Sequence, residues 1–194
     1  MFRRPFQVAQ ISGIPIRISS GWVLSVVFYS WALGTFCLPV LVQGISPVAA
    51  YPLGLLSTLL LFVGVLAHEL GHASIARRHG TKVEGINLGL LGGGARLWGN
   101  ANTPKEEILY SLAGPAVTAA IIIGLFGLLF VLPSGTPKVV SVLVFYQLFM
   151  NAMILAFNLL PIFPLDGGRA LRSLLQLRRE HTVRPSTSNS RAFW

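Results

Sequence analysis

The sequence predicts an all-α polytopic membrane protein with about four transmembrane helices and a glycine-rich segment between the second and third of them. The first observation is composition. Of the 194 residues, 53% are hydrophobic and only 11% are charged, whereas a soluble domain carries roughly 25% charged residues. The second observation is that four apolar runs reach the about 20 residues that a helix needs to cross a bilayer. This composition excludes an ordinary soluble enzyme and a disordered chain.

The four apolar runs cover about residues 18–43, 48–76, 108–132 and 139–166. The first run is too long for the apolar part of a signal peptide, and no small-residue cleavage site follows it at once. We therefore expect it to be retained as a helix. We expect one membrane-embedded domain over residues 1–180, followed by a disordered tail over the polar, Ser/Thr-rich residues to the end of the chain, 181–194.

The basic residues lie almost entirely on one side of the predicted helices. They occur before the first run, between the second and third, and after the fourth, and only Lys138 falls between the third and fourth. Since Lys and Arg are retained on the cytoplasmic side, we expect both termini in the cytoplasm and a multi-pass chain in the cell (plasma or inner) membrane. The net charge of +9 then reports topology and contact with the lipid bilayer, and we expect no nucleic-acid partner.

The long connection between the second and third runs contains three successive glycines, Gly92, Gly93 and Gly94. Glycine is unfavourable inside a helix, and apolar residues alternate loosely with glycines from Glu84 to Trp98. We therefore expect a β-hairpin or a re-entrant loop here. Such a backbone is tolerated at membrane depth only where it is buried in protein or lines a water-filled cavity.

Two histidines and a glutamate stand out inside the second apolar run, in the segment His68-Glu-Leu-Gly-His72. Residues four apart share a helix face, so His68 and His72 can direct two imidazoles at one metal ion. Glu69 is offset by one residue and projects beside the ion, where a carboxylate can deprotonate a zinc-bound water. The alternative is that both histidines extend toward the polar interface beside Arg77 and Arg78 without binding metal.

A catalytic zinc site usually has three protein ligands, and Asp166 is the third candidate that the predicted topology allows. The second and fourth runs cross the membrane in the same direction, and the histidine pair and Asp166 both fall toward the cytoplasmic ends. Two prolines interrupt the helix before Asp166, and Gly167 and Gly168 allow the backbone to turn after it. The alternative role for Asp166 is a helix-end carboxylate that pairs with Arg169 or Arg172.

Three segments of the chain together resemble the site-2 protease family, whose members are intramembrane zinc metalloproteases. The similarity covers about residues 11–175. The segments that carry it are His68-Glu-Leu-Gly-His72, Ala113-Gly-Pro115 and Asn158-Leu-Leu-Pro-Ile-Phe-Pro-Leu-Asp-Gly-Gly-Arg169. The chain departs from the family pattern at Thr118, three residues after the Gly-Pro pair, where the family often has asparagine. This departure bears on a polar contact of the third helix and not on the zinc site.

The resemblance implies that His68, His72 and Asp166 hold one Zn²⁺ ion per chain and that Glu69 is the general base. It implies hydrolysis of peptide bonds within or near the transmembrane segments of single-span membrane proteins. It also implies that a membrane-associated hairpin in the glycine-rich connection presents the substrate. Asn158 could contact the substrate backbone or the oxyanion, although a hydrogen bond between helices explains this residue equally well.

Two other functions fit parts of the sequence. A catalytically silent relative would bind transmembrane helices without cutting them, but it has no need of Glu69. A transporter places its binding groups near the membrane midplane and often has repeat symmetry. In this chain the ionisable residues gather toward one end of the predicted helices, and the sequence contains no repeat. We predict no particular oligomeric state.

Overall fold

The computed structural model describes residues 5–90, 92–98, 101 and 103–183. Within this part of the chain, four helices are long and apolar enough to cross a membrane, as the composition predicts. Most of the predicted tail, residues 184–194, lies outside the described residues, and its first three residues end the helix α6 (Asp166–Val183).

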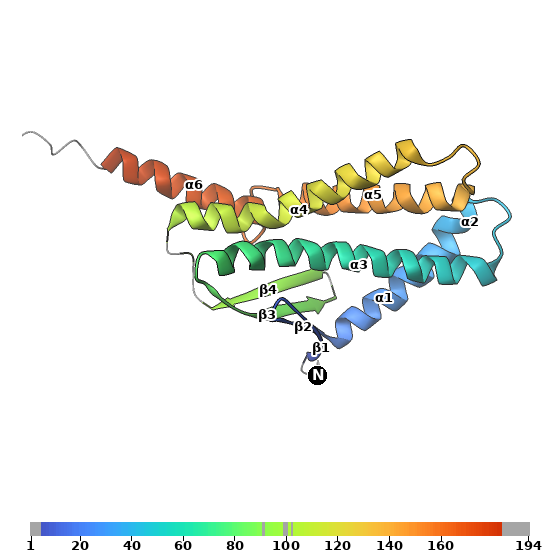
Figure 1. Ribbon diagram of the computed structural model, residues 1–194, viewed down its shortest axis with the longest axis horizontal. Coiled ribbons are helices and arrows are strands. Elements are labelled where there is room, and N and C mark those ends of the chain that lie inside the picture. The colour runs from blue at the N-terminus through green and yellow to red at the C-terminus, as the bar shows by residue number, and fades with distance from the viewer. Residues whose placement is uncertain (1–4, 91, 99–100, 102, 184–194) are drawn as a thin grey trace, which may run out of the picture.

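The long helix α3 (Pro47–Arg78) occupies the centre of the molecule. Figure 1 shows α4 (Pro104–Val131) along one side of α3 and a small β-sheet along the other side. The next helix, α5 (Lys138–Asn158), packs against α4, and α6 packs along the N-terminal half of α4 and extends beyond the bundle. The central helix therefore faces both the sheet and the other long helices.

The first crossing segment changes its helical winding along its length. Helix α1 (Ser20–Ala32) continues into a π-helical segment, Leu33–Cys37, and then into α2 (Leu38–Leu41). The segment packs closely against α3, because a Cβ atom added to Gly54 would lie only 2.7 Å from the carbonyl oxygen of Ser30. Small residues that let two backbones approach in this way are typical of helix packing in membranes.

The outward faces of the crossing helices are apolar. Val63, Phe130 and Phe145 are 61%, 75% and 58% exposed, and such side chains suit a surrounding of lipid tails. Polar side chains point inward instead. The Nε2 atom of Gln147 in α5 donates to the backbone oxygen of Ser57 in α3 at 2.6 Å and to its hydroxyl oxygen at 2.9 Å. This is the helix–helix hydrogen bond expected of a polar residue in a membrane.

Four strands form one mixed sheet among the described residues, in the order β1-β2-β3-β4. β1 (Phe6–Ile11) and β2 (Ile14–Ile18) form one antiparallel hairpin, and β3 (Lys82–Gly89) and β4 (Gly92–Trp98) form another. Strands β2 and β3 join the two hairpins in parallel. The hairpin predicted from the glycine-rich connection is confirmed, whereas the N-terminal hairpin is a feature that the sequence pattern does not predict.

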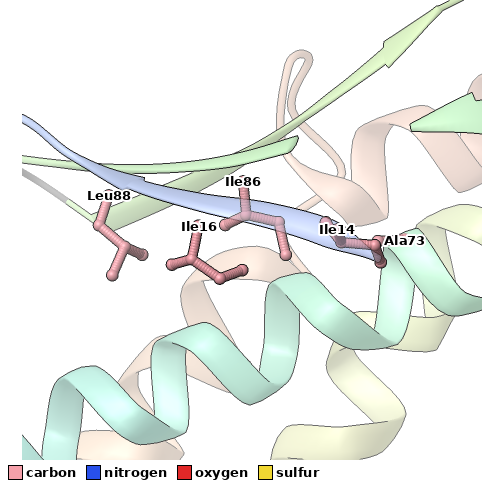
Figure 2. Close-up of a cluster of buried hydrophobic side chains, with 5 residues drawn as sticks. All are labelled: Ile14, Ile16, Ala73, Ile86 and Leu88. Atoms are coloured by element: carbon pink, nitrogen blue, oxygen red, sulfur yellow. The ribbon is translucent and has the colours of Figure 1, made fainter. Parts of the chain in front are cut away.

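The sheet packs on α3 through a cluster of buried apolar side chains. Figure 2 shows its five members, Ile14, Ile16, Ala73, Ile86 and Leu88. Ala73 and Ile86 are completely buried, and the small side chain of Ala73 lets the strands lie close to the helix. The cluster therefore holds β3, and with it β4, beside the turn of α3 that precedes Ala73.

Polar contacts hold both hairpins at their turns. The hydroxyl of Ser25 in α1 donates to the backbone oxygen of Leu90, at the turn between β3 and β4, at 2.5 Å. The guanidinium of Arg77, near the end of α3, donates to the backbone oxygen of Ser12 in the turn between β1 and β2. Each hairpin is therefore attached to a crossing helix at its turn as well as along its strands.

The fourth crossing helix is shorter than expected. We expected it to extend over residues 139–166, whereas α5 ends at Asn158 and a separate helix, α6, begins at Asp166. Pro161 has no backbone N–H and its ring would clash with the preceding turn of a continued helix, so the predicted interruption is confirmed. Asp166 is consequently the first residue of a new helix and not the last residue of a membrane span.

The two glycines after Asp166 act differently from the prediction. Gly167 and Gly168 do not turn the chain, because they lie in the first turn of α6. The loop before α6 folds against them. A Cβ atom on Gly167 would collide with the backbone oxygen of Leu159, and a Cβ atom on Gly168 would lie 2.5 Å from the backbone nitrogen of Phe163. The absence of a side chain therefore makes room for the loop.

We predict that Ile86→Ala lowers the free energy of unfolding of the purified chain in detergent by about 2–5 kcal/mol, because it leaves a cavity between the sheet and α3. The control is Val8→Ala in β1, where the side chain is 50% exposed, and it should change this free energy by less than about 0.5 kcal/mol. Equal losses in the two variants would contradict the role of the cluster as the anchor of the sheet.

Candidate metal centre

Three side chains from two helices meet at one buried point. His68 and His72 lie one turn apart on α3 and are 4% and 7% exposed, and Asp166, at the start of α6, is 8% exposed. The Nε2 atoms of the two histidines are 3.1 Å apart, and each lies 3.3 Å from Oδ2 of Asp166. The structure therefore brings together the three residues predicted as metal ligands.

The other nitrogen of each imidazole has a hydrogen-bond partner on α4. Nδ1 of His72 lies 2.6 Å from the backbone oxygen of Tyr110, and since a carbonyl oxygen only accepts, Nδ1 carries the proton and donates it. Nδ1 of His68 lies 2.9 Å from the hydroxyl oxygen of Thr118, and we assign the same tautomer there. Thr118 therefore does bear on the candidate centre, contrary to the expectation from the sequence. With Nδ1 protonated, Nε2 of each neutral ring presents a lone pair to the shared point.

This arrangement fits a tetrahedral zinc ion. At zinc–ligand bond lengths of about 2.0–2.1 Å, tetrahedral geometry separates neighbouring ligand atoms by about 3.3 Å, close to the observed 3.1 and 3.3 Å. Oδ2 of Asp166 is buried and has no hydrogen-bond partner. An unpartnered carboxylate oxygen beside two imidazole lone pairs therefore suits a bound cation.

Helix α4 shapes the centre through three residues spaced four apart. Tyr110 and Thr118 hold the imidazoles through their oxygens. Gly114, between them, makes room for both rings, because a Cβ atom there would lie 2.6 Å from Nε2 of His68 and would collide with Nε2 of His72. Tyr110 is a contact of the site that the sequence pattern does not predict. Its contribution is a backbone oxygen, which no residue type signals.

The alternative role of Asp166, pairing with an arginine, is not what the structure shows. Arg169 pairs with Glu107 of α4, with Nη2 2.8 Å from Oε1. The guanidinium of Arg172 lies over the ring of Phe163, 6.0 Å from its centroid. The carboxylate of Asp166 is directed at the histidines instead.

Glu69 lies between α3 and the sheet. Its half-buried side chain contacts β4, where a Cβ atom on Gly93 would lie 2.6 Å from Cγ and 3.2 Å from Oε1 of Glu69. Only glycine at this point of the strand leaves room for the glutamate. The glycine-rich strand therefore covers the residue that the sequence predicts as the general base.

Asn158, predicted as a substrate contact, is the last residue of α5. Its Nδ2 atom donates to the backbone oxygen of Ile154, one turn earlier in the same helix, at 2.9 Å. The predicted contact of Asn158 with substrate therefore stays a prediction.

Comparison with known proteins places the chain in a family. A model of peptidase family M50 matches residues 56–139 and 133–192. The chain is 35% identical over 192 residues to Rip3 of Mycobacterium tuberculosis, and the aligned region covers 98% of this chain and 48% of that protein. It is 42% identical over 119 residues to the zinc metalloprotease MJ0392 of Methanocaldococcus jannaschii, and the aligned region covers 60% of this chain and 33% of that protein. The chain thus spans about half the length, or less, of these curated relatives.

A solved structure supports the same assignment. The site-2 protease of Methanocaldococcus jannaschii superposes with a TM-score of 0.61 at 30% sequence identity, over 90% of this chain and 73% of that one. The match covers most of the chain and agrees with the family model. The chain therefore belongs to peptidase family M50, the site-2 proteases.

Proposed function

We propose that the chain is an intramembrane zinc metalloendopeptidase that hydrolyses peptide bonds within or near transmembrane segments of membrane proteins. The observation that carries the proposal is the convergence of two Nε2 lone pairs and one carboxylate oxygen within 3.3 Å of one another. Such a set of electron-pair donors in apolar surroundings is unfavourable unless a cation lies among them. The zinc metalloproteases among the relatives support Zn²⁺ as that cation.

In this proposal His68, His72 and Asp166 hold one Zn²⁺ ion. When bound, zinc polarises a substrate carbonyl and lowers the pKa of a coordinated water toward about 7. Glu69, next to His68 on the same helix, accepts a proton from the attacking water and passes it to the leaving amine. The close approach of Gly93 in β4 to the Glu69 side chain limits where this carboxylate can lie.

Strand β4 is the proposed docking edge for the substrate. A peptide bond inside a helix is shielded by the hydrogen bonds of the helix, so the substrate must unwind locally before it is cut. Its freed backbone groups then need new partners, which an edge strand supplies by strand addition. β4 ends the sheet among the described strands and contacts Glu69, so an added strand would pass close to the general base.

We further propose single-span membrane proteins as substrates and a cytoplasmic position for both termini. The placement of Lys and Arg before α1, after α3 and after α5 supports this topology. His72 lies five residues before Arg77, which corresponds to about 7 Å along a helix. A centre at this depth needs only a short aqueous path from the cytoplasmic side. Asn158, at the end of α5, is a proposed contact of the bound substrate.

We predict that Glu69→Gln lowers the rate of cleavage of a single-span test substrate by about 100-fold or more, because it removes the general base. Zinc content should stay near that of the wild type, since Glu69 is not a proposed ligand. Both quantities are measured on purified protein in detergent. Zinc in both proteins with cleavage by neither would favour a catalytically silent relative, and wild type without zinc would refute the metal centre.

We predict that Gly114→Ala lowers zinc content sharply, because the added methyl group occupies the space of both Nε2 atoms. The matched control is Gly124→Ala on the same helix, where nothing lies within 4 Å of an added Cβ atom. The control should bind zinc as the wild type does, and both variants are compared by metal analysis after gel filtration. Unchanged zinc in Gly114→Ala would show that α4 does not pack against the ligands in this way.

We predict that Thr118→Val weakens zinc binding by about 10-fold or more, because outer hydrogen-bond partners orient the ligand imidazoles. Valine has nearly the shape of threonine but cannot accept the Nδ1 proton of His68. Thr118→Ser keeps the hydroxyl and should stay close to wild type. Zinc affinity is measured by competition with a chelator. Equal weakening by serine and valine would point to lost packing in place of the hydrogen bond.

A further inference from the structure

The first turn of α6 is fastened to the first turns of α4 by an ion pair. Nε of Arg169 donates to Oε1 of Glu107 at 2.9 Å, and Nη2 lies 2.8 Å from the same oxygen. The two side chains are 30% and 25% exposed, so most of the pair is shielded from solvent. Residues 107 and 169 are 62 positions apart in the chain, and the contact joins two separate helices.

Arg169 stands on the same side of α6 as Asp166. Residues three apart on a helix are neighbours about 5–6 Å from each other. Whatever fixes Arg169 against α4 therefore also fixes the position of the Asp166 carboxylate along and around the axis of α6. Backbone support for this turn comes from the preceding loop, which rests on Gly167 and Gly168.

Glu107 belongs to the same face of α4 that shapes the rest of the centre. Glu107, Tyr110, Gly114 and Thr118 follow one another at spacings of three, four and four, which places them along one stripe of a helix. Three of them contact the imidazoles, and the fourth binds the helix that carries the carboxylate. One stripe of α4 therefore positions the proposed ligands of α3 directly and binds the helix α6, which carries the third proposed ligand.

The position of Glu107 is itself well defined. The hydroxyl of Thr103 accepts a hydrogen bond from the backbone N–H of Glu106 at 3.2 Å and caps the start of α4. An acidic side chain in the first turn of a helix is favoured by the helix dipole. Glu107 is therefore placed on a capped and electrostatically suited turn, from which it can hold an arginine.

We propose that the Glu107–Arg169 ion pair is a positioning device that holds Asp166 at ligand distance from His68 and His72. This inference rests on the proposed metal centre and assigns the pair no contact with substrate or zinc. Without the pair, the first turn of α6 is free to shift along α4, and the third ligand leaves the point where the two Nε2 atoms meet. The ion pair therefore affects zinc affinity only by setting the position of Asp166.

The test measures zinc affinity of the full chain in detergent, by competition with a chelator. Glu107→Gln and Arg169→Gln should each weaken zinc binding by about 10-fold or more, the range typical of residues that orient a ligand. The controls make the same change of charge on the same two helices, with Glu106→Gln beside Glu107 on α4 and Arg179→Gln ten residues beyond Arg169 on α6. Both controls should bind zinc within about 2-fold of the wild type.

A double-mutant cycle separates positioning from a general loss of stability. In a background of Asp166→Ala, the third ligand is absent, so Glu107→Gln should weaken the remaining zinc binding by less than about 2-fold. If Glu107→Gln weakens binding by the same factor with and without Asp166, the pair supports the fold in general and the proposal is overturned. Wild-type affinity in Glu107→Gln would overturn it as well.

A charge exchange covers the case in which a single variant fails to fold. Glu107→Arg combined with Arg169→Glu restores an ion pair, and the double variant should bind zinc more tightly than either single change. Tighter binding supports the proposal and its absence contradicts it. A wild type that binds no zinc would refute the metal centre itself, whereas a zinc-binding wild type with unaffected pair variants refutes only the positioning role.

Discussion

The structure depends on holding two imidazole lone pairs and a carboxylate within 3.3 Å of one another in an apolar interior. These groups do not attract one another as they are presented, because the proton of each ring is on the side away from the shared point. The surrounding protein must therefore hold these three groups together. Helix α4 holds the rings through Tyr110 and Thr118 and leaves space for them at Gly114.

The three residues of the candidate metal centre could be identified from the sequence because an apolar chain makes them conspicuous. His68, His72 and Asp166 interrupt or end long apolar segments, and an ionisable group there is costly enough to indicate function. The hairpin of β3 and β4 was predictable for a related reason, since three successive glycines exclude a helix. In both cases a local departure from the background composition carried the information.

What the sequence did not reveal depends on distant pairing or on backbone atoms. The partner of His72 is the carbonyl oxygen of Tyr110, and every residue has such an oxygen, so no residue type indicates it. The partner of Arg169 is 62 positions away. A Gly-Gly pair suggests a turn in the chain. In the structure Gly167 and Gly168 lie inside a helix, and their lack of side chains makes room for the preceding loop. These features depend on tertiary packing, which a local pattern does not contain.

The parallel pairing of β2 with β3 has a consequence for the order of assembly. β2 precedes the first crossing helix and β3 follows the second, so almost seventy residues separate partners such as Ile16 and Ile86. During synthesis the N-terminal hairpin must wait until two helices are inserted before its edge is paired. Contacts so distant in sequence form late. The sheet that carries the strand over Glu69 can therefore be completed only after α3, the helix that bears Glu69, has been synthesised.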